Sequence, residues 1–242
     1  MRVIRLTIAY DGTDFCGWQR QPDSRTVQGA IEEALAGLAG KRVPVVGAGR
    51  TDAGVHAEGQ VATFRTALRL GNEEMLRALN ALLPKDVRVF SVQTAPPDFH
   101  ARRSARSKVY RYRIWNGPRV SPFLFRYVLH WPGRLDFEKM AQAARLFERK
   151  ADFTAFSSNR LLRPVRRVLR SELGKKGREI IYTVEAEGFL RYMVRTMVGT
   201  LLEVGRGRVE PAMIEELFSR KKRSLASPTA PAKGLCLIKV AY

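Results

Sequence analysis

Acidic residues, cysteines and long apolar runs are all scarce in this sequence. Its 242 residues hold 23 aspartates and glutamates against 43 lysines and arginines, which leaves a formal net charge of +20. The two cysteines, Cys16 and Cys236, are too few and too far apart for a disulfide framework. No apolar run approaches the roughly 18 residues that a membrane span requires. We therefore expect a soluble, cytoplasmic protein with reduced thiols and no membrane partner.

Metal ligands are scarce as well. The three histidines, His56, His100 and His130, are scattered along the chain without the spacing of a metal site. The sequence therefore predicts no metal, and any chemistry has to come from other side chains.

The surplus of positive charge is the strongest feature of the composition. A surface with this charge repels itself unless something anionic binds to it. Basic residues gather in three segments, 100–108, 159–167 and 219–224. One basic run is more often a solvated face than a binding site, and a charged surface adapted to heat is an alternative for all three. Three such runs in one chain favour a nucleic acid, whose phosphates they would contact.

The order of hydrophobic patterns predicts two α+β halves, residues 1–104 and 105–242. In the first half the patterns predict a strand, a helix, two strands, a helix and a strand, at 2–10, 26–40, 43–47, 60–66, 71–84 and 86–95. This β-α-β-β-α-β order is typical of ferredoxin-like and RRM-like units.

The second half repeats this order with one additional helix. The patterns predict strands at 108–115, 163–173, 179–188 and 234–242, and helices at 135–149, 189–205 and 210–220. We expect the two halves to form a central mixed, mostly antiparallel sheet, with a ligand-binding cleft between them.

Glycines interrupt a short apolar run in VVGAGRTDAGVHAEG, residues 45–59. A nucleotide-binding loop is excluded, because Asp52 occupies the third glycine position of G-x-G-x-x-G and the lysine of a phosphate loop is missing. An aspartic protease would need two closely apposed aspartates, and a glycosidase would need a second carboxylate near Asp52, such as Glu58. Neither function explains the positive charge. The simplest alternative is that Asp52 caps a turn and Arg50 lies on the surface.

The segment GAGRTDAGVHA resembles the signature loop of the tRNA pseudouridine synthase A family. Other segments resemble the family in the same order along the chain: YDGTDFCGWQRQP, TVQGAIEEAL, FHARRSARSKVYRYRI, DFTAFSS, GFLRYMVRTMVGTLLEVGRG and APAKGLCL. The resemblance covers essentially the whole chain. It implies the pseudouridine synthase fold, a homodimer, and conversion of uridine to pseudouridine at positions 38–40 of the anticodon stem-loop of tRNA, without cofactor or metal.

Five residues receive roles from this resemblance. Asp52 matches the nucleophile that acts on a flipped-out uridine, and Arg195 matches the arginine that pairs with it. Tyr110 matches the tyrosine that stacks on the target uracil, and Leu235 matches an apolar contact in the uracil pocket. Arg50 matches the arginine that enters the space left by the flipped nucleotide.

The residue types suit this chemistry. A carboxylate can attack the nucleoside and later leave, and a buried carboxylate needs a nearby cation to stay ionised. The sequence does not decide whether the attack is on the sugar, on the uracil ring, or replaced by elimination. The residues alone also allow plainer roles: Arg195 can extend from a core helix into water, and Tyr110 shares a strand face with Tyr112 and Ile114, as core residues do.

Two other functions compete with this interpretation. A tandem RRM-like protein that binds RNA without catalysis would carry the aromatic RNP1 stretch, which the sequence lacks. A nucleoside hydrolase would need a metal or an acidic constellation, and neither is visible in the sequence.

Overall fold

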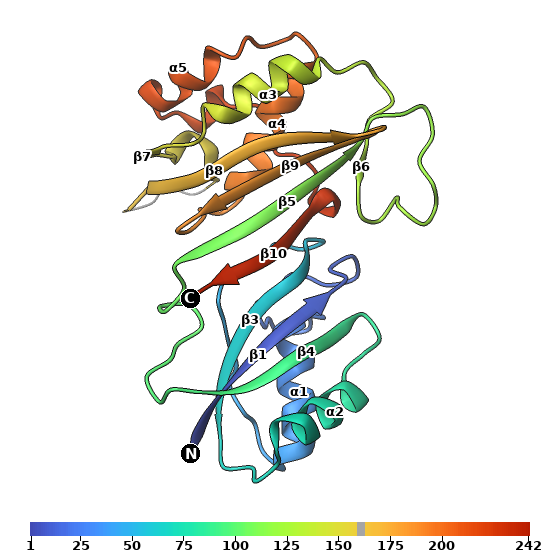
Figure 1. Ribbon diagram of the computed structural model, residues 1–242, viewed down its shortest axis with the longest axis vertical. Coiled ribbons are helices and arrows are strands. Elements are labelled where there is room, and N and C mark those ends of the chain that lie inside the picture. The colour runs from blue at the N-terminus through green and yellow to red at the C-terminus, as the bar shows by residue number, and fades with distance from the viewer. Residues whose placement is uncertain (159–162) are drawn as a thin grey trace. The chain divides into compact units, whose positions relative to one another are not determined.

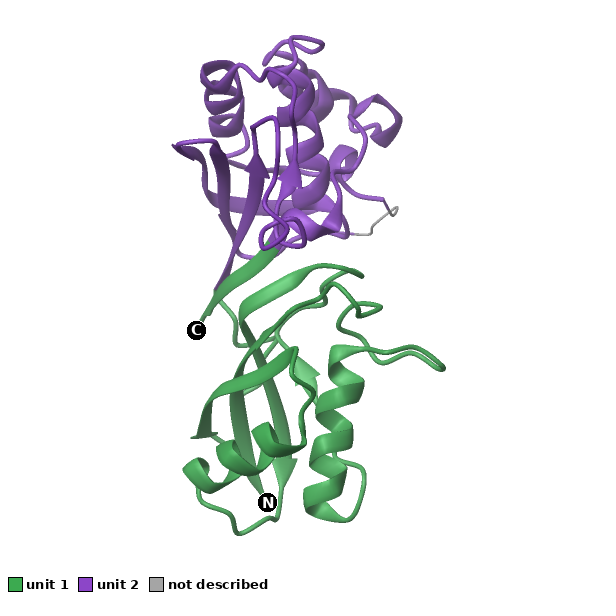
Figure 2. Cartoon of the chain, turned by 90° about the vertical axis from the view of Figure 1, so that its right-hand side faces the viewer, with its two compact units in different colours: residues 1–106, 236–242 green, residues 107–235 purple. Residues whose placement is uncertain are grey.

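A computed structural model describes residues 1–158 and 163–242, so the first four residues of the basic segment 159–167 lie outside the described part. The chain forms two compact units (Figure 2): unit 1 comprises residues 1–106 and 236–242, and unit 2 comprises residues 107–235. The final strand therefore belongs with unit 1. Within the described ranges, no helix has the length and apolar character needed to cross a membrane.

Unit 1 has the ferredoxin-like element order that the sequence predicts. Its elements are β1 (Arg2–Tyr10), α1 (Val27–Ala39), β2 (Val46–Gly47), β3 (His56–Thr66), α2 (Asn72–Leu82) and β4 (Val87–Ala95). Strand β1 pairs antiparallel with both β3 and β4, and β2 pairs antiparallel with β3. The resulting order β4-β1-β3-β2 places both helices on one face of the sheet (Figure 1).

Alternating burial along β1 builds the core of this unit. Ile4, Leu6 and Ile8 are fully buried, and α1 adds the fully buried Ile31 and Leu35 from its own apolar stripe. Each such side chain stabilises the fold by about 1.5 to 3 kcal/mol relative to an exposed position. Since the alternation continues to the last residue of β1, that residue also points toward the helices.

Strand β3 has two partners on the edge opposite β1. Thr63 pairs with Val46 of β2, whereas His56 pairs, in parallel, with Cys236 of β10 (Leu235–Ala241). Because β2 has only two residues, the first part of β3 is left for β10. Gly59 allows this close approach, since a Cβ atom there would lie 2.3 Å from the carbonyl oxygen of Ile238.

Unit 2 is also α+β. Its elements are β5 (Ser107–Trp115), β6 (Leu129–His130), α3 (Phe137–Arg145), β7 (Lys150–Asp152), β8 (Val165–Lys176), β9 (Glu179–Ala186), α4 (Met193–Gly205) and α5 (Met213–Arg220). Strand β9 pairs antiparallel with β5 and β8, β7 pairs antiparallel with β8, and β6 pairs parallel with β5. Figure 1 shows α3, α4 and α5 grouped on one side of β8 and β9.

The pairing in both units is mostly antiparallel with parallel additions, which confirms the predicted α+β class and the mixed sheet. The helix predicted over 189–205 begins only at Met193, because Tyr192 has a left-handed backbone with φ of 63°. The cleft expected between the two halves stays a prediction.

Candidate active site

The loop that carries Asp52 joins β2 to β3, and its first half is fixed by β3. Ala48 N donates a hydrogen bond to the carbonyl oxygen of Val61 at 2.7 Å. The side chain of Gln60, which is fully buried, donates from Nε2 to the carbonyl oxygen of Gly49 at 2.9 Å. A glycine-rich loop is thereby held in one place before it reaches Asp52.

The segment that follows β1 fixes the second half of the loop. Trp18 N donates to the carbonyl oxygen of Thr51 at 3.0 Å, and Gly54 N donates to that of Phe15 at 3.3 Å. Gly17 has φ of 91°, and a Cβ atom there would lie 2.7 Å from the carbonyl oxygen of Thr51. Two stretches that resemble separate family motifs are therefore parts of one local structure.

Burial alternates across the three residues at the tip of the loop. Thr51 is buried, with 7% of its surface exposed, whereas Arg50 is exposed and Asp52 is half-buried. The Thr51 hydroxyl lies 2.8 Å from the hydroxyl of the buried Tyr10. Thr51 is therefore held inward, beside an exposed Arg50 and a half-buried Asp52.

Tyr110 and Tyr112 lie on the buried face of β5, as the alternation in the sequence predicts. The ring of Tyr110 meets the ring of Phe189 edge to face, with 5.1 Å between centroids. Tyr112 is fully buried and donates from its hydroxyl to the carbonyl oxygen of Pro231 at 2.8 Å. Burial raises the pKa of Tyr112 above its ordinary range, against a smaller opposite effect of Arg195, so this hydroxyl keeps its proton.

Arg195 is half-buried in the first turns of α4. Its Nε donates to the carbonyl oxygen of Ala230 at 2.8 Å, and Ala230 N donates back to the carbonyl oxygen of Arg195 at 3.0 Å. The guanidinium also lies over the ring of Tyr192, 4.9 Å from its centroid. The side chain is therefore held against its own unit rather than extended freely into water. Its pairing with Asp52 stays a prediction.

No role for Tyr192 was predicted from the sequence. Its left-handed backbone, with φ of 63°, is costly for a residue other than glycine, and such strain is concentrated at functional sites. The guanidinium of Arg191 lies 4.9 Å from the same ring that Arg195 contacts. Tyr192 therefore helps to orient two arginines at the start of α4.

Leu235 is buried, with 5% of its surface exposed, at the first position of β10. The glycine before it packs on the tyrosine of β5, since a Cβ atom at Gly234 would lie 2.6 Å from Cε1 of Tyr112. The candidate residues thus form two groups: Arg50 and Asp52 in unit 1, and Tyr110, Arg195 and Leu235 in unit 2. That both groups act on one nucleoside stays a prediction.

Comparison with known proteins decides the family. A family model described as tRNA pseudouridine synthase matches residues 6–102 and 143–242. The chain belongs to the tRNA pseudouridine synthase family. The tRNA pseudouridine synthase A of Methylacidiphilum infernorum is 46% identical over 98% of this chain and 94% of its own length. That of Geobacillus kaustophilus is 46% identical over 99% and 94%, and that of Thermodesulfovibrio yellowstonii is 41% identical over 99% of both chains.

Solved structures include a more distant match. A chain of the archaeal box H/ACA sRNP Nop10-Cbf5 complex is 16% identical, with a TM-score of 0.35, over 82% of this chain and 43% of its own length.

Membership of the tRNA pseudouridine synthases confirms the resemblance seen in the sequence and the enzyme class. The reaction is the isomerisation of uridine in tRNA to pseudouridine, and the chain is an isomerase. The competing interpretation as a non-catalytic tandem RRM-like protein is wrong.

The basic segment 100–108 presents arginines of this pseudouridine synthase to the solvent. His100 Nδ1 accepts hydrogen bonds from the backbone N–H groups of Arg102 and Arg103, at 3.2 and 3.3 Å. Both arginine side chains are exposed. The turn is further fixed where the hydroxyl of Tyr242 donates to the carbonyl oxygen of Ala101 at 2.8 Å. The two charges are therefore carried on an ordered backbone.

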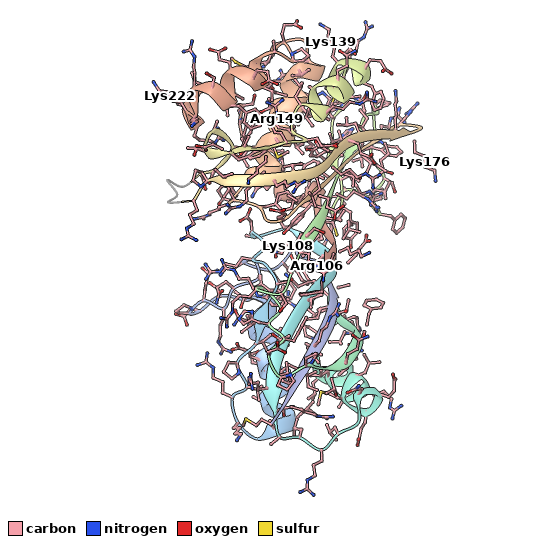
Figure 3. All side chains as sticks on the ribbon, turned by 60° about the vertical axis from the view of Figure 1, so that its left-hand side comes forward. Arg106, Lys108, Lys139, Arg149, Lys176 and Lys222 are labelled. Atoms are coloured by element: carbon pink, nitrogen blue, oxygen red, sulfur yellow. The ribbon has the colours of Figure 1, made fainter. Side chains whose placement is uncertain are left out.

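Some of the positive charges in the basic segment 219–224 are already paired with acidic residues. Arg220 pairs with Glu216 at 2.7 Å, and Lys221 lies 3.4 Å from a carboxylate oxygen of Asp152. Lys222 is exposed. Figure 3 labels it with other basic side chains, of which Lys139, Arg149 and Lys176 lie outside the three basic segments. Positive charge is thus spread over many elements rather than confined to the three segments.

Proposed function

We propose that this enzyme isomerises uridine to pseudouridine at positions 38–40 in the anticodon stem-loop of tRNA, with Asp52 as the nucleophile. One observation carries the proposal: in a member of this family, the half-buried carboxylate of Asp52 stands on a loop whose backbone is fixed on both sides of it. A nucleophile works best when its position is set before the substrate arrives.

The reaction rearranges bonds without adding or removing atoms overall. The bond from C1′ to N1 of uracil breaks, a bond from C1′ to C5 forms, the proton on C5 is lost, and N1 takes up a proton. Asp52 attacks the nucleoside and leaves again once the uracil has turned. No electrons are gained or lost, so the reaction requires no redox group.

The other candidate residues have supporting roles in this proposal. Arg195 keeps Asp52 ionised, because an opposite charge nearby favours the charged form of a carboxyl group. Tyr110 stacks on the uracil, and Leu235 gives it an apolar contact. Arg50, which is exposed beside Asp52, enters the space that the flipped nucleotide leaves. Turning the base out of its stack costs a few kcal/mol, which such contacts offset.

The remaining parts of the proposal concern the setting in which the enzyme works. The resemblance implies a homodimer in the cytoplasm, and Cys16 and Cys236, which are not in a disulfide, are compatible with a reducing compartment. A mass of 27.4 kDa for the protein in light scattering would contradict the homodimer.

The proposal is tested by the release of tritium from tRNA labelled at C5 of uridine, without added metal or cofactor. We expect the wild-type protein to release tritium and Asp52→Asn to release none, because the amide is not a nucleophile. Asp98→Asn is the matched control, since Asp98 is an exposed carboxylate of the same unit. It should release tritium at the wild-type rate.

Two outcomes would contradict the proposal in different ways. If the wild-type protein binds the labelled tRNA but releases no tritium, the proposed activity is wrong. If Asp52→Asn releases tritium as fast as Asp98→Asn does, Asp52 is not the nucleophile.

A further inference from the structure

We propose that Tyr10, Thr51 and Gln60 form a buried anchor that positions Asp52 from beneath its loop. They act as positioning residues, and the inference rests on the proposed role of Asp52. All three belong to unit 1 and are buried, with 4%, 7% and 0% of their surface exposed.

The register of the sheet brings the anchor together. Tyr10 ends β1 on the helix-covered face, and Gln60 lies on the same face of β3, where it is paired with Ile8. Between Ile8 and Tyr10 the register shifts, because β3 contains one extra residue opposite β1 at this point. The bulge occurs next to the loop that carries Asp52, and bulges commonly redirect side chains beside active sites.

Two hydrogen bonds tie the anchor to the loop. The hydroxyls of Tyr10 and Thr51 lie 2.8 Å apart, and either can donate to the other. The side chain of Gln60 donates to the carbonyl oxygen of Gly49 at 2.9 Å, and it lies near enough to the Tyr10 phenol to oppose the rise of its pKa. The anchor therefore holds the loop at Gly49 and at Thr51, one residue on each side of Arg50.

The polarity of the anchor is costly unless every group is satisfied. A buried hydroxyl or amide without a partner destabilises a fold, so three such groups on a core face indicate a specific requirement. The loop has this requirement: its glycines leave the backbone flexible, so it needs contacts from outside to hold it in place. Thr51 is joined to Asp52 by a peptide bond, so a displacement of Thr51 also displaces the carboxylate.

Burial keeps the anchor in one protonation state. It raises the pKa of the Tyr10 phenol above the ordinary range, against smaller opposite effects of the hydrogen bonds from Thr51 and Gln60. The hydroxyl therefore stays protonated throughout the neutral range. Loss of the anchor should lower turnover by a similar factor at every pH in that range.

The test is a double-mutant cycle with Tyr10→Phe and Thr51→Val, each of which removes one hydroxyl and keeps the shape of the side chain. Single-turnover tritium release, the Kd for tRNA and the melting temperature are measured for both single variants and the double variant. We expect each single variant to lose about 10- to 100-fold in the rate of turnover, because a displacement of about 1 Å can cost about 100-fold. The Kd should stay unchanged.

The double variant should be no slower than the slower single variant, because the two hydroxyls act through one hydrogen bond. Tyr182→Phe is the matched control: Tyr182 is a fully buried tyrosine of unit 2 whose hydroxyl lies 2.7 Å from that of Ser171. This control should lower the melting temperature and leave the rate of turnover unchanged.

Three results would overturn the proposed anchor. The first is a wild-type rate of turnover in Tyr10→Phe, and the second is a double variant whose rate loss is the product of the two single losses. The third is a loss of turnover in Tyr182→Phe equal to that in Tyr10→Phe. If Tyr10→Phe does not fold, Thr51→Val is compared with Thr51→Ser, which keeps the hydroxyl, and equal rates in these two overturn the proposal. An inactive Asp52→Asn beside a fully active Tyr10→Phe would reject the anchor alone, whereas an active Asp52→Asn would reject the proposed nucleophile.

Discussion

At the scale of single residues, Gly47 shows how closely the loop of Asp52 is packed. A Cβ atom at this position would lie 2.5 Å from Cε2 of the Trp18 indole, which is itself buried. The backbone N–H of Trp18 also holds the carbonyl oxygen of Thr51 at 3.0 Å. Trp18 therefore contacts the beginning of the loop with its ring and the tip with its backbone.

We expect Gly47→Ala to displace Trp18 and with it the tip of the loop. Overpacking of this kind costs about 1 to 3 kcal/mol of stability, and turnover should fall because the carboxylate moves with the tip. Thermal unfolding and tritium release measure the two effects. Gly174→Ala is the control, since a Cβ atom there meets nothing within 4 Å. A melting temperature of Gly47→Ala equal to that of Gly174→Ala would refute the packing argument.

The sequence revealed candidate residues where a local motif carries them, as for Asp52. It did not reveal the anchor, because Tyr10 and Thr51 are 41 positions apart and meet only through the register of β1 and β3. One signal was present: Gln60 alternates with Ala62 and Phe64 on a buried strand face, where a polar residue needs a partner.

At the scale of elements, α1 is joined by a buried carboxylate to the segment just before β2, the strand that leads into the loop of Asp52. The Glu32 side chain has 1% of its surface exposed and lies 3.2 Å from Arg20 Nη1. It accepts hydrogen bonds from Val45 N at 3.2 Å and from Gln28 Nε2 at 2.9 Å. Since Val45 directly precedes β2, the helix fixes the chain where this strand begins.

We expect Glu32→Ala to lower the free energy of unfolding by about 1 to 3 kcal/mol, because the N–H of Val45 loses its buried acceptor. Urea unfolding measures the change. Glu33→Ala is the control: its side chain is 73% exposed, and a surface change of this kind should stay within about 0.5 kcal/mol. Equal stabilities of the two variants would show that the bond from Val45 to the carboxylate does not stabilise the fold.

Elements with strong periodicity and clear caps were predicted closely. The helix expected over 26–40 is α1, with Thr26 as its N-cap and Gly40 as its C-cap at φ of 66°. Strands β6 and β7 were missed, because two or three residues are too few to show a period. Their pairing depends on neighbouring strands, which a local pattern does not contain.

At the scale of the whole molecule, the net charge of +20 was available from the sequence, but the share of it that is free to bind was not. Arg149 forms two hydrogen bonds with Glu215, whereas Arg102 and Arg103 are exposed on an ordered turn. A count of charges does not separate paired from exposed cations, because the pairs join residues from different elements.

We expect the double variant Arg102→Gln with Arg103→Gln to weaken tRNA binding and to reduce its dependence on salt. Each phosphate contact that is lost lowers the slope of log K against log salt by about 0.7 to 0.9. Titrations of tRNA binding at several salt concentrations measure the slope. Arg149→Gln is the control, because that arginine already has an acidic partner. A slope unchanged from the control would place Arg102 and Arg103 away from the RNA.

Because β2 and β10 share one edge of β3, the sheet of unit 1 is completed late during protein synthesis. The ribosome makes residues 1–106 first, yet the sheet of unit 1 is complete only after residues 236–242 have been added. While residues 107–235 are being synthesised, the start of β3 carries backbone groups without their final partner strand, and such open edges readily pair with other chains. The sheet of the first unit therefore keeps an unpaired edge at the start of β3 until the second unit has been synthesised.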